Sequence, residues 1–182
     1  MRVWRTRPIG RGFAIDGRVR YTKMVIRQSF LFLLKEQPIE KITVADICRL
    51  AEINRATFYR HYENQYGVLY ELEDQLLEQA QPAGTEESKG TIPFLQTVFQ
   101  TLAGKKEEWD LLLASKADPG LPLRLCAFLE RNLPPGGKEI DRRFFLHGLS
   151  GLAMDWMEGG FQEPAEQMAE RTAQYFQDLA GG

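Results

Sequence analysis

The chain has 182 residues, of which 43% are hydrophobic and 26% charged, and its net charge is −2. This composition is typical of a globular protein and excludes the fibrous and intrinsically disordered classes. Charge-free apolar runs such as Phe144–Met154 are too short to span a bilayer, and the first residues lack the apolar core of a secretory signal. We therefore expect a cytoplasmic protein with no membrane partner.

The residues that carry catalysis or bind metals are sparse. The cysteines, Cys48 and Cys126, lie far apart among apolar neighbours, which predicts buried thiols in a reducing compartment. With only His61 and His147 besides, the sequence contains no metal-ligand cluster. It also lacks a nucleophile–base set and a glycine-rich phosphate loop. We predict no metal, no cofactor and no enzymatic activity.

Charge is distributed unevenly along the chain. Residues 1–65 hold 13 Lys and Arg against 6 Asp and Glu, a charge of +7, whereas residues 66–182 hold 10 against 19, a charge of −9. A basic first third joined to an acidic remainder indicates an anionic partner at one end only.

The first 17 residues, Met1–Gly17, are rich in arginine and glycine but show no helical periodicity. We expect a basic flexible arm, which is either a disordered leader or a segment that reaches into a DNA minor groove. A helix should follow from about residue 18 to residue 35. Its core-facing stripe has the spacing i, i+4, i+7, i+8 and consists of Ile26, Phe30, Leu33 and Leu34.

Residues 42–62 predict two short helices joined by a tight turn. Thr43 is an N-cap, and Asp46 three residues later completes a capping-box pair. The first helix, residues 44–51, should bury Ile47, Leu50 and Ala51.

Asn54 is a second N-cap, so the second short helix should begin at Arg55. Phe58 and Tyr62 are expected to face inward. The side chains left outside are those of Arg55, Thr57, Tyr59 and Arg60. Two helices with a three-residue turn, the second carrying exposed Arg, Thr and Tyr, form a helix-turn-helix pattern.

The run 43–62, T-V-x-D-I-x-x-x-A-x-I-x-R-x-T-F-Y-x-H-Y, resembles the DNA-binding module of the TetR family of bacterial transcriptional regulators. The resemblance implies an all-α fold with a helix-turn-helix DNA-binding domain at 18–65 and a helical ligand-sensing and dimerisation domain at 66–182. It also implies a homodimer that regulates transcription, usually as a repressor, at a near-palindromic double-stranded operator. The sequence departs from the family at Glu52, where a glycine with positive φ is usual, and at Gln65, where many members carry a phosphate-contacting lysine.

The expected recognition helix, Arg55–His61, would lie in the major groove, which admits one α-helix. Arg55 and Arg60 would read guanine, whereas Ala56 and the Thr57 methyl would touch thymine methyl groups. Other side chains and the amides at the start of the first short helix would hold phosphates. The predicted DNA-binding residues are Thr43, Val44, Ala45, Arg55, Ala56, Thr57, Tyr59, Arg60, His61 and Gln65.

Beyond residue 62 the pattern predicts only helices. Asn64 should cap one that carries Leu69, Leu72, Leu76 and Leu77 on one face, and the polar stretch 81–90 should end it. Further helices are expected at 91–104, 105–115, 122–132, 140–159 and 164–179. The run Gly148–Phe161 also resembles the regulatory half of a TetR subgroup.

In that family the last two helices pair with their symmetry mates, and the regulatory half encloses an effector pocket. The residues we assign to a dimer interface are Phe145, Leu149, Leu152, Trp156, Tyr175 and Phe176. Those we assign to a small-molecule effector pocket are Phe94, Phe99, Trp109, Phe144, His147 and Trp156. For both sets the alternative is the core of the monomer itself.

A second functional hypothesis is a helical dimeric adaptor that binds a protein partner and has weakened DNA binding. Glu52 and Gln65 favour it, because each departs from a feature that supports DNA binding in the family. Steep salt-dependent DNA binding would exclude it.

Overall fold

The computed structural model describes residues 11–81, 90–114, 118–133 and 138–180, with side chains described from residue 17 to residue 177 of those ranges. Nine α-helices, one short 3₁₀ helix and no strand occur in these ranges, which confirms the all-α prediction. The chain divides into two compact units, residues 1–68 and residues 69–182.

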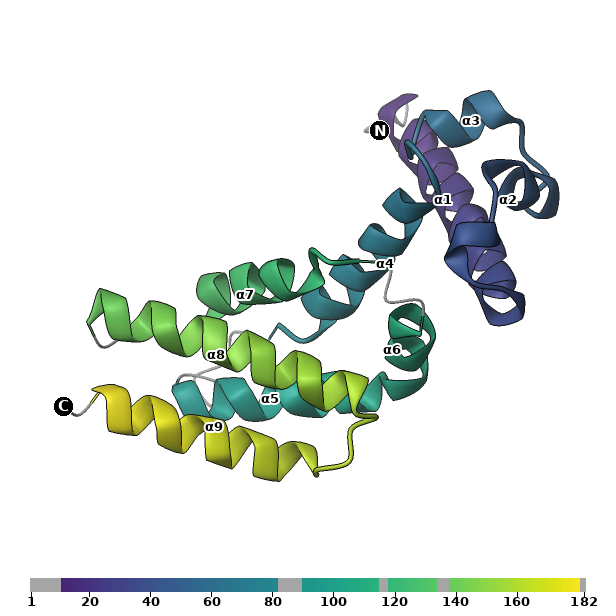
Figure 1. Cartoon of the computed structure of the whole chain (residues 1–182). Helices are drawn as coiled ribbons and strands as arrows, with labels where there is room; N and C mark the ends of the chain where they lie inside the picture. Colours follow the sequence, from purple (N-terminus) through teal and green to yellow (C-terminus); the bar gives the residue numbers. More distant parts are fainter. Residues whose placement is uncertain (1–10, 82–89, 115–117, 134–137, 181–182) are drawn as a thin grey trace, which may run out of the picture. The chain divides into compact units, whose positions relative to one another are not determined.

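The first unit contains α1 (Arg11–Glu36), the 3₁₀ helix Ile39–Lys41, α2 (Val44–Leu50) and α3 (Arg55–Tyr59). α1 packs against α2, and α2 packs against α3 (Figure 1). α1 begins at Arg11, earlier than the residue 18 predicted, so part of the expected arm is helical. Residues 1–10, the rest of that arm, lie outside the described residues.

The core of the first unit forms around Phe30, Ile47 and Phe58, each with no exposed surface. The prediction that Leu50 is buried is wrong, because its side chain is 45% exposed and Cys48 takes the inner position. At about 100° per residue, Leu50 lies roughly 110° from the middle of the arc that the buried Ile47 and Cys48 define. Ala51, also predicted to be buried, is half-buried. A helix as short as α2 buries only that arc.

α4 (Gln65–Gln79) begins in the first unit and continues in the second, which also contains α5 (Thr91–Gly104), α6 (Lys106–Leu113), α7 (Leu121–Asn132), α8 (Glu139–Glu158) and α9 (Ala165–Ala180). α5 lies along α9, and α8 contacts α6, α7 and α9 (Figure 1). The five helices α5–α9 lie within two residues of their predicted bounds. None of the described helices is long and apolar enough to cross a membrane.

Aromatic side chains fill the core of the second unit. Phe94, Phe99 and Trp109 are at most 2% exposed, and the ring centroids of Phe99 and Trp156 are 5.2 Å apart in an edge-to-face contact. Both cysteines, Cys48 and Cys126, are buried and free, as predicted, and burial raises the pKa of each thiol.

Candidate nucleic-acid interface

The start of α2 is fixed by a complete capping box. The Asp46 backbone N–H donates to Thr43 Oγ1 at 3.1 Å, and the Thr43 N–H donates back to Asp46 Oδ2 at 3.3 Å. The Thr43 hydroxyl also donates to Asp46 Oδ2 at 2.6 Å, which lowers the pKa of that carboxyl. These bonds satisfy amides that the first turn of a helix leaves free, so the local sequence alone sets where α2 begins.

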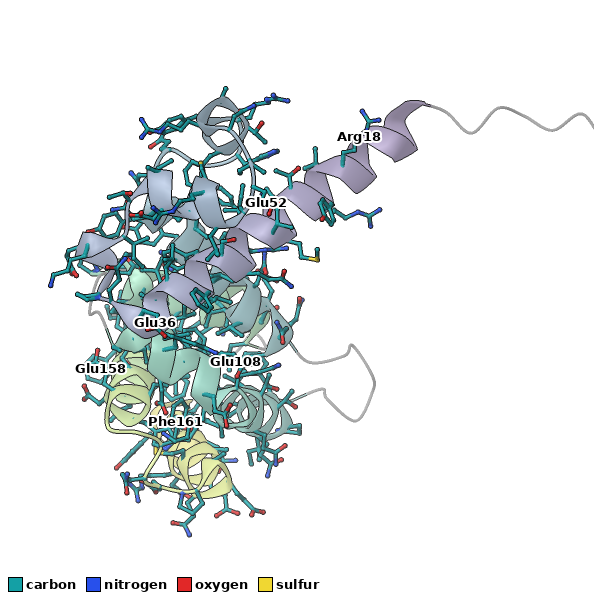
Figure 2. The ribbon with its side chains drawn as sticks, turned by 90° about the vertical axis from the view of Figure 1, so that its right-hand side faces the viewer. Arg18, Glu36, Glu52, Glu108, Glu158 and Phe161 are labelled. Carbon is teal, nitrogen blue, oxygen red and sulfur yellow. The ribbon has the colours of Figure 1, made fainter. Side chains whose placement is uncertain are left out.

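The turn between α2 and α3 is a Schellman motif. The Ile53 N–H donates to the Cys48 carbonyl at 3.0 Å, and the Glu52 N–H points to the Arg49 carbonyl at 3.4 Å. This motif needs a residue in the left-handed region, and Glu52 occupies it with a φ of 52°. Figure 2 labels Glu52 among the side chains. A left-handed residue with a Cβ costs roughly 1–2 kcal/mol. The turn therefore keeps the geometry that a glycine would give, at an energetic cost.

α3 begins as the sequence predicts but ends earlier. Asn54 caps it by accepting the Thr57 N–H at 2.7 Å. The helix ends at Tyr59 rather than His61, because the backbone there forms a tighter hydrogen bond between residues three apart. The N–H groups of His61 and Tyr62 both donate to the Phe58 carbonyl, at 2.9 and 3.0 Å.

Phe58 anchors α3 in the core of the first unit. It is fully buried, its ring centroid lies 5.6 Å from that of Tyr62, and Tyr59 meets its ring edge-on at 5.7 Å. The Lys23 ammonium lies 5.4 Å from the centre of the Tyr62 ring, which is close enough for a cation–π contact. Burying Phe58 fixes the rotation of α3 and leaves Arg55 and Arg60 exposed.

None of the ten predicted DNA-binding residues is buried in the core. Five are exposed, namely Thr43, Arg55, Ala56, Tyr59 and Arg60, and five are half-buried, namely Val44, Ala45, Thr57, His61 and Gln65. Eight of them lie at the N-cap or in the first turn of α2, or on α3 and its C-cap, Arg60. Guanidinium groups at such positions form bidentate bonds with guanine edges, and hydroxyl groups hold phosphates. The surface therefore has the donors that reading a DNA groove requires.

The six residues assigned to an effector pocket do not line one common cavity, although Phe99 and Trp156 are in ring contact. Phe94, Phe99, Trp109 and Trp156 are buried in the packed core, whereas Phe144 is 72% exposed. His147 is also exposed, and it lines a different cavity, between α7 and α8, where its Nδ1 is 3.8 Å from the Cys126 sulfur.

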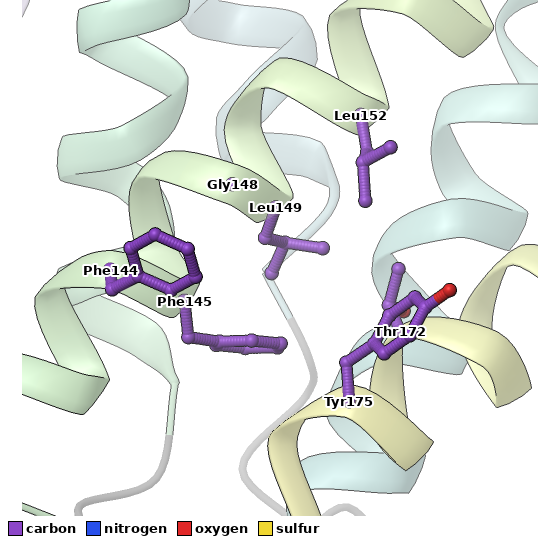
Figure 3. Close-up of a pocket in the computed structure, with 7 residues that line it drawn as sticks. All are labelled: Phe144, Phe145, Gly148, Leu149, Leu152, Thr172 and Tyr175. Atoms are coloured by element: carbon purple, nitrogen blue, oxygen red, sulfur yellow. The ribbon is translucent and has the colours of Figure 1, made fainter. Parts of the chain in front are cut away.

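An open apolar groove of about 360 Å³ lies between α8 and α9. Phe144, Phe145 and Leu149 project into it from α8, and Tyr175 faces them from α9 (Figure 3). Of the six residues assigned to a dimer interface, Leu152 and Tyr175 are 43% and 52% exposed, Phe176 is half-buried, and Phe145, Leu149 and Trp156 are buried.

Sequence reasoning missed a cluster of charges in the second unit. Glu73 of α4 is 1% exposed and pairs with Arg124 of α7, which also contacts Asp74 at 2.8 Å and Asp118 at 2.6 Å. The signal was present, because Glu73 interrupts the apolar stripe of α4 one turn before Leu77. Leu72, predicted for that stripe, is only half-buried.

Comparison with known proteins identifies the class of the chain. Residues 91–178 match a TetR-type family model described as "Transcriptional regulator C-terminal region". Over 56 residues the chain is 45% identical to the uncharacterized HTH-type transcriptional regulator YxbF of Bacillus subtilis (strain 168). That alignment spans 30% of this chain and 15% of the relative's length. The fold and these matches define a helix-turn-helix regulator of transcription.

Solved structures share the fold of this chain. A TetR transcriptional regulator from Streptococcus agalactiae 2603V is 24% identical, with a TM-score of 0.63 over 93% of this chain and 98% of that one. The repressor AlkX from Dietzia sp. strain DQ12-45-1b has a TM-score of 0.60 at 15% identity, over 88% of this chain and 98% of that one. The dihydroxyacetone kinase operon activator DhaS has a TM-score of 0.57 at 14% identity, over 88% and 96%. The chain belongs to the TetR family of transcriptional regulators.

Proposed function

We propose that this regulator is a homodimer that binds a near-palindromic operator in double-stranded DNA through α3 and is released by a small-molecule effector. The observation that carries the proposal is the capped α2–turn–α3 unit, which buries Phe58 and leaves Arg55, Tyr59 and Arg60 exposed. The charge of +7 on residues 1–65 supports the same surface, because phosphate attraction supplies much of the affinity for DNA.

Dimerisation is supported by the α8–α9 groove. Phe144, Leu152 and Tyr175 present apolar surface to solvent there, and open space lies above Gly148 and Gly151. A face of this kind is typical of a helix-on-helix contact with a second copy. Two recognition helices related by a twofold axis would reach successive major grooves about 34–36 Å apart.

Repression is the proposed direction of regulation, because a dimer seated across its own upstream DNA blocks access to that DNA. AlkX is named as a repressor and DhaS as an activator, so similarity of fold leaves the direction to experiment. Transcription in vitro from the upstream region, with and without the protein, should fall when the protein is added. A rise would make the chain an activator.

DNA binding is tested by fluorescence anisotropy of the full chain with fragments from upstream of its own gene, at several salt concentrations. We expect one fragment to bind specifically and the affinity to fall steeply with salt. The double variant Arg55→Ala/Arg60→Ala should lose the preference for that fragment, since each guanine contact contributes about 1–3 kcal/mol of discrimination.

The matched control is Lys35→Ala/Lys41→Ala, which also removes two positive charges, but from other exposed positions of the same unit. It should weaken binding to all fragments equally or leave it unchanged, with the preference intact. Weak binding that responds neither to salt nor to the arginine variants would reject α3 as the DNA-reading element and favour the protein-partner hypothesis.

A further inference from the structure

A cavity of about 190 Å³ lies in the second unit among α4, α6, the start of α7 and α8. Leu112, Leu121 and Met154 form apolar parts of its wall. Three acidic residues, Glu73, Asp118 and Glu158, also line it. The volume is below the roughly 300–1,000 Å³ of sites for drug-sized ligands, so only a small molecule fits.

Among the described residues around this cavity, carboxyl groups outnumber cations. The side chains of Glu73 and Asp118 are only 2% and 5% exposed, and both pair with the single guanidinium of Arg124. Arg124 is also bonded to the more exposed Asp74, at 2.8 Å. Among the described residues, one cation is thus shared by three carboxyl groups, two of them deeply buried. Buried carboxylates are costly unless each is paired, and here the two buried ones share one guanidinium.

Protonation of Glu73 reduces the negative charge of this cluster. Burial, together with the neighbouring Asp118, raises the pKa of Glu73 to about 8, against the opposing effect of Arg124. Asp74 on α4 and Glu158 on α8 add negative charge on the other sides. At neutral pH the Glu73 carboxyl is therefore mostly protonated. A cation that entered the cavity would favour the ionised form and displace this proton.

We propose that this cavity binds a small organic cation, with an ammonium or amidinium group against Glu73 and Asp118 and a short apolar body against Leu112, Leu121 and Met154. The buried carboxylates select the charge of the ligand, and the cavity volume limits its size. That such a cation acts as the effector rests on the function proposed above, whereas its binding does not.

The same carboxylates join α7 to α4, which suggests how a bound cation would act. Arg124 contacts Glu73 and Asp74, its guanidinium carbon lies 5.1 Å from the Tyr70 ring centre, and Arg131 contacts Glu78 at 3.1 Å. A ligand cation would compete with Arg124 for Glu73 and Asp118. Competition at this point would loosen α7 from the helix that continues out of the first unit, and so give the ligand different affinities for two states of the protein.

The test uses isothermal titration calorimetry of the full chain with three probes of one shape: cyclohexylammonium, cyclohexanol and cyclohexanecarboxylate. We expect the cation to bind at least about tenfold more tightly than the alcohol, and the carboxylate not to bind. The affinity for cyclohexylammonium should rise between pH 6 and pH 8, by up to about tenfold per pH unit, because binding releases the proton of Glu73. Equal binding of the cation and the alcohol, or no binding of the cation, would overturn the proposal.

Two isosteric variants locate the site. Glu73→Gln should weaken cation binding at least about tenfold and abolish its pH dependence, and Asp118→Asn should weaken it comparably. Glu107→Gln on the exposed side of α6 is the matched control and should bind as the natural chain does. Circular dichroism verifies that each variant is folded. Unchanged binding in both Glu73→Gln and Asp118→Asn would overturn the proposal. The titration contains no DNA, so its failure would leave the DNA-binding function, tested by anisotropy, untouched.

Discussion

The polar contacts that shape the candidate DNA-binding surface in the first unit are short-range in sequence, whereas those of Arg124 with α4 in the second unit are long-range. In the first unit the polar contacts that shape α2 and α3 join residues three apart, as Thr43 joins Asp46 and Asn54 joins Thr57. In the second unit Arg124 reaches carboxyl groups 50 and 51 residues away. A local cap fixes an exposed surface cheaply, whereas a distant ion pair fixes a buried one only if the whole unit folds around it. The first arrangement suits a surface that reads another molecule, and the second suits a group whose charge state matters.

The strongest test of this contrast is Phe58→Ala, because one buried ring supports the exposed side chains of α3. Truncating a fully buried phenylalanine costs about 3–5 kcal/mol. We expect the variant to lose DNA binding in the anisotropy assay and to lose part of its helical signal on mild heating. Tyr59→Ala, at a 56% exposed position, should cost less, about 0.5–1.5 kcal/mol, because it removes only the edge-on contact with the Phe58 ring. An unchanged melting temperature for Phe58→Ala would show that local caps alone hold α3.

In the second unit the corresponding exposed surface is the α8–α9 groove, and Leu152→Glu tests its role. The 43% exposed side chain tolerates a carboxylate in a monomer, but in a dimer interface an unpaired carboxylate costs several kcal/mol. We expect the dissociation constant of the dimer to increase by on the order of a hundredfold, measured by light scattering after size-exclusion chromatography over a range of protein concentrations.

Leu123→Glu is the matched control for that experiment, because Leu123 is 66% exposed on α7 and does not line the groove. It should leave the oligomeric state unchanged. A Leu152→Glu protein that remains dimeric would exclude the α8–α9 groove as the contact between copies.

The contrast between units also explains what the sequence could predict. The capping box at Thr43, the cap at Asn54 and the burial of Phe58 follow from short-range patterns, and the structure confirms all three. The helices of the second unit were predicted equally well, because glycine, proline and apolar periodicity mark their bounds.

The contents of the second unit's cavities were not predictable in the same way. Phe144 and Trp109 are both aromatic residues on apolar helices, yet one is 72% exposed and the other fully buried. The difference depends on which face of each helix the other helices cover, and a single sequence does not encode that face locally. In the sequence, Glu73 is recognisable only as an acidic residue in an apolar stripe. Its partner Arg124 is three helices further along the chain, so the sequence does not show the pair.

Glu73→Gln measures the cost of the buried charge through the pH dependence of stability. The pKa of Glu73 is raised to about 8 in the folded protein from an ordinary value of 4.5, so the folded state holds the extra proton between these values. Stability from this group is therefore present at pH 4.5 and is lost as the pH rises toward 8, by at most about 1.4 kcal/mol per pH unit. Thermal melts should show that loss in the natural chain and a flatter profile in Glu73→Gln. An identical profile in both would show that Glu73 is ionised throughout.

The smallest expected effect is at Glu52, the residue with positive φ in the turn between α2 and α3. Its left-handed φ of 52° costs roughly 1–2 kcal/mol, and a glycine there would remove that cost while losing about 0.5–1 kcal/mol to greater freedom in the unfolded chain. Glu52→Gly should therefore stabilise the protein by roughly 0.5–1 kcal/mol, seen as a modest rise in melting temperature. Glu52→Ala keeps the Cβ and should give no such rise. If the glycine variant also binds DNA more tightly than the alanine variant, the strain at Glu52 limits how well α3 is held for its partner. If the two bind equally, the Schellman turn already places α3 correctly, and the only effect of Glu52 is on stability.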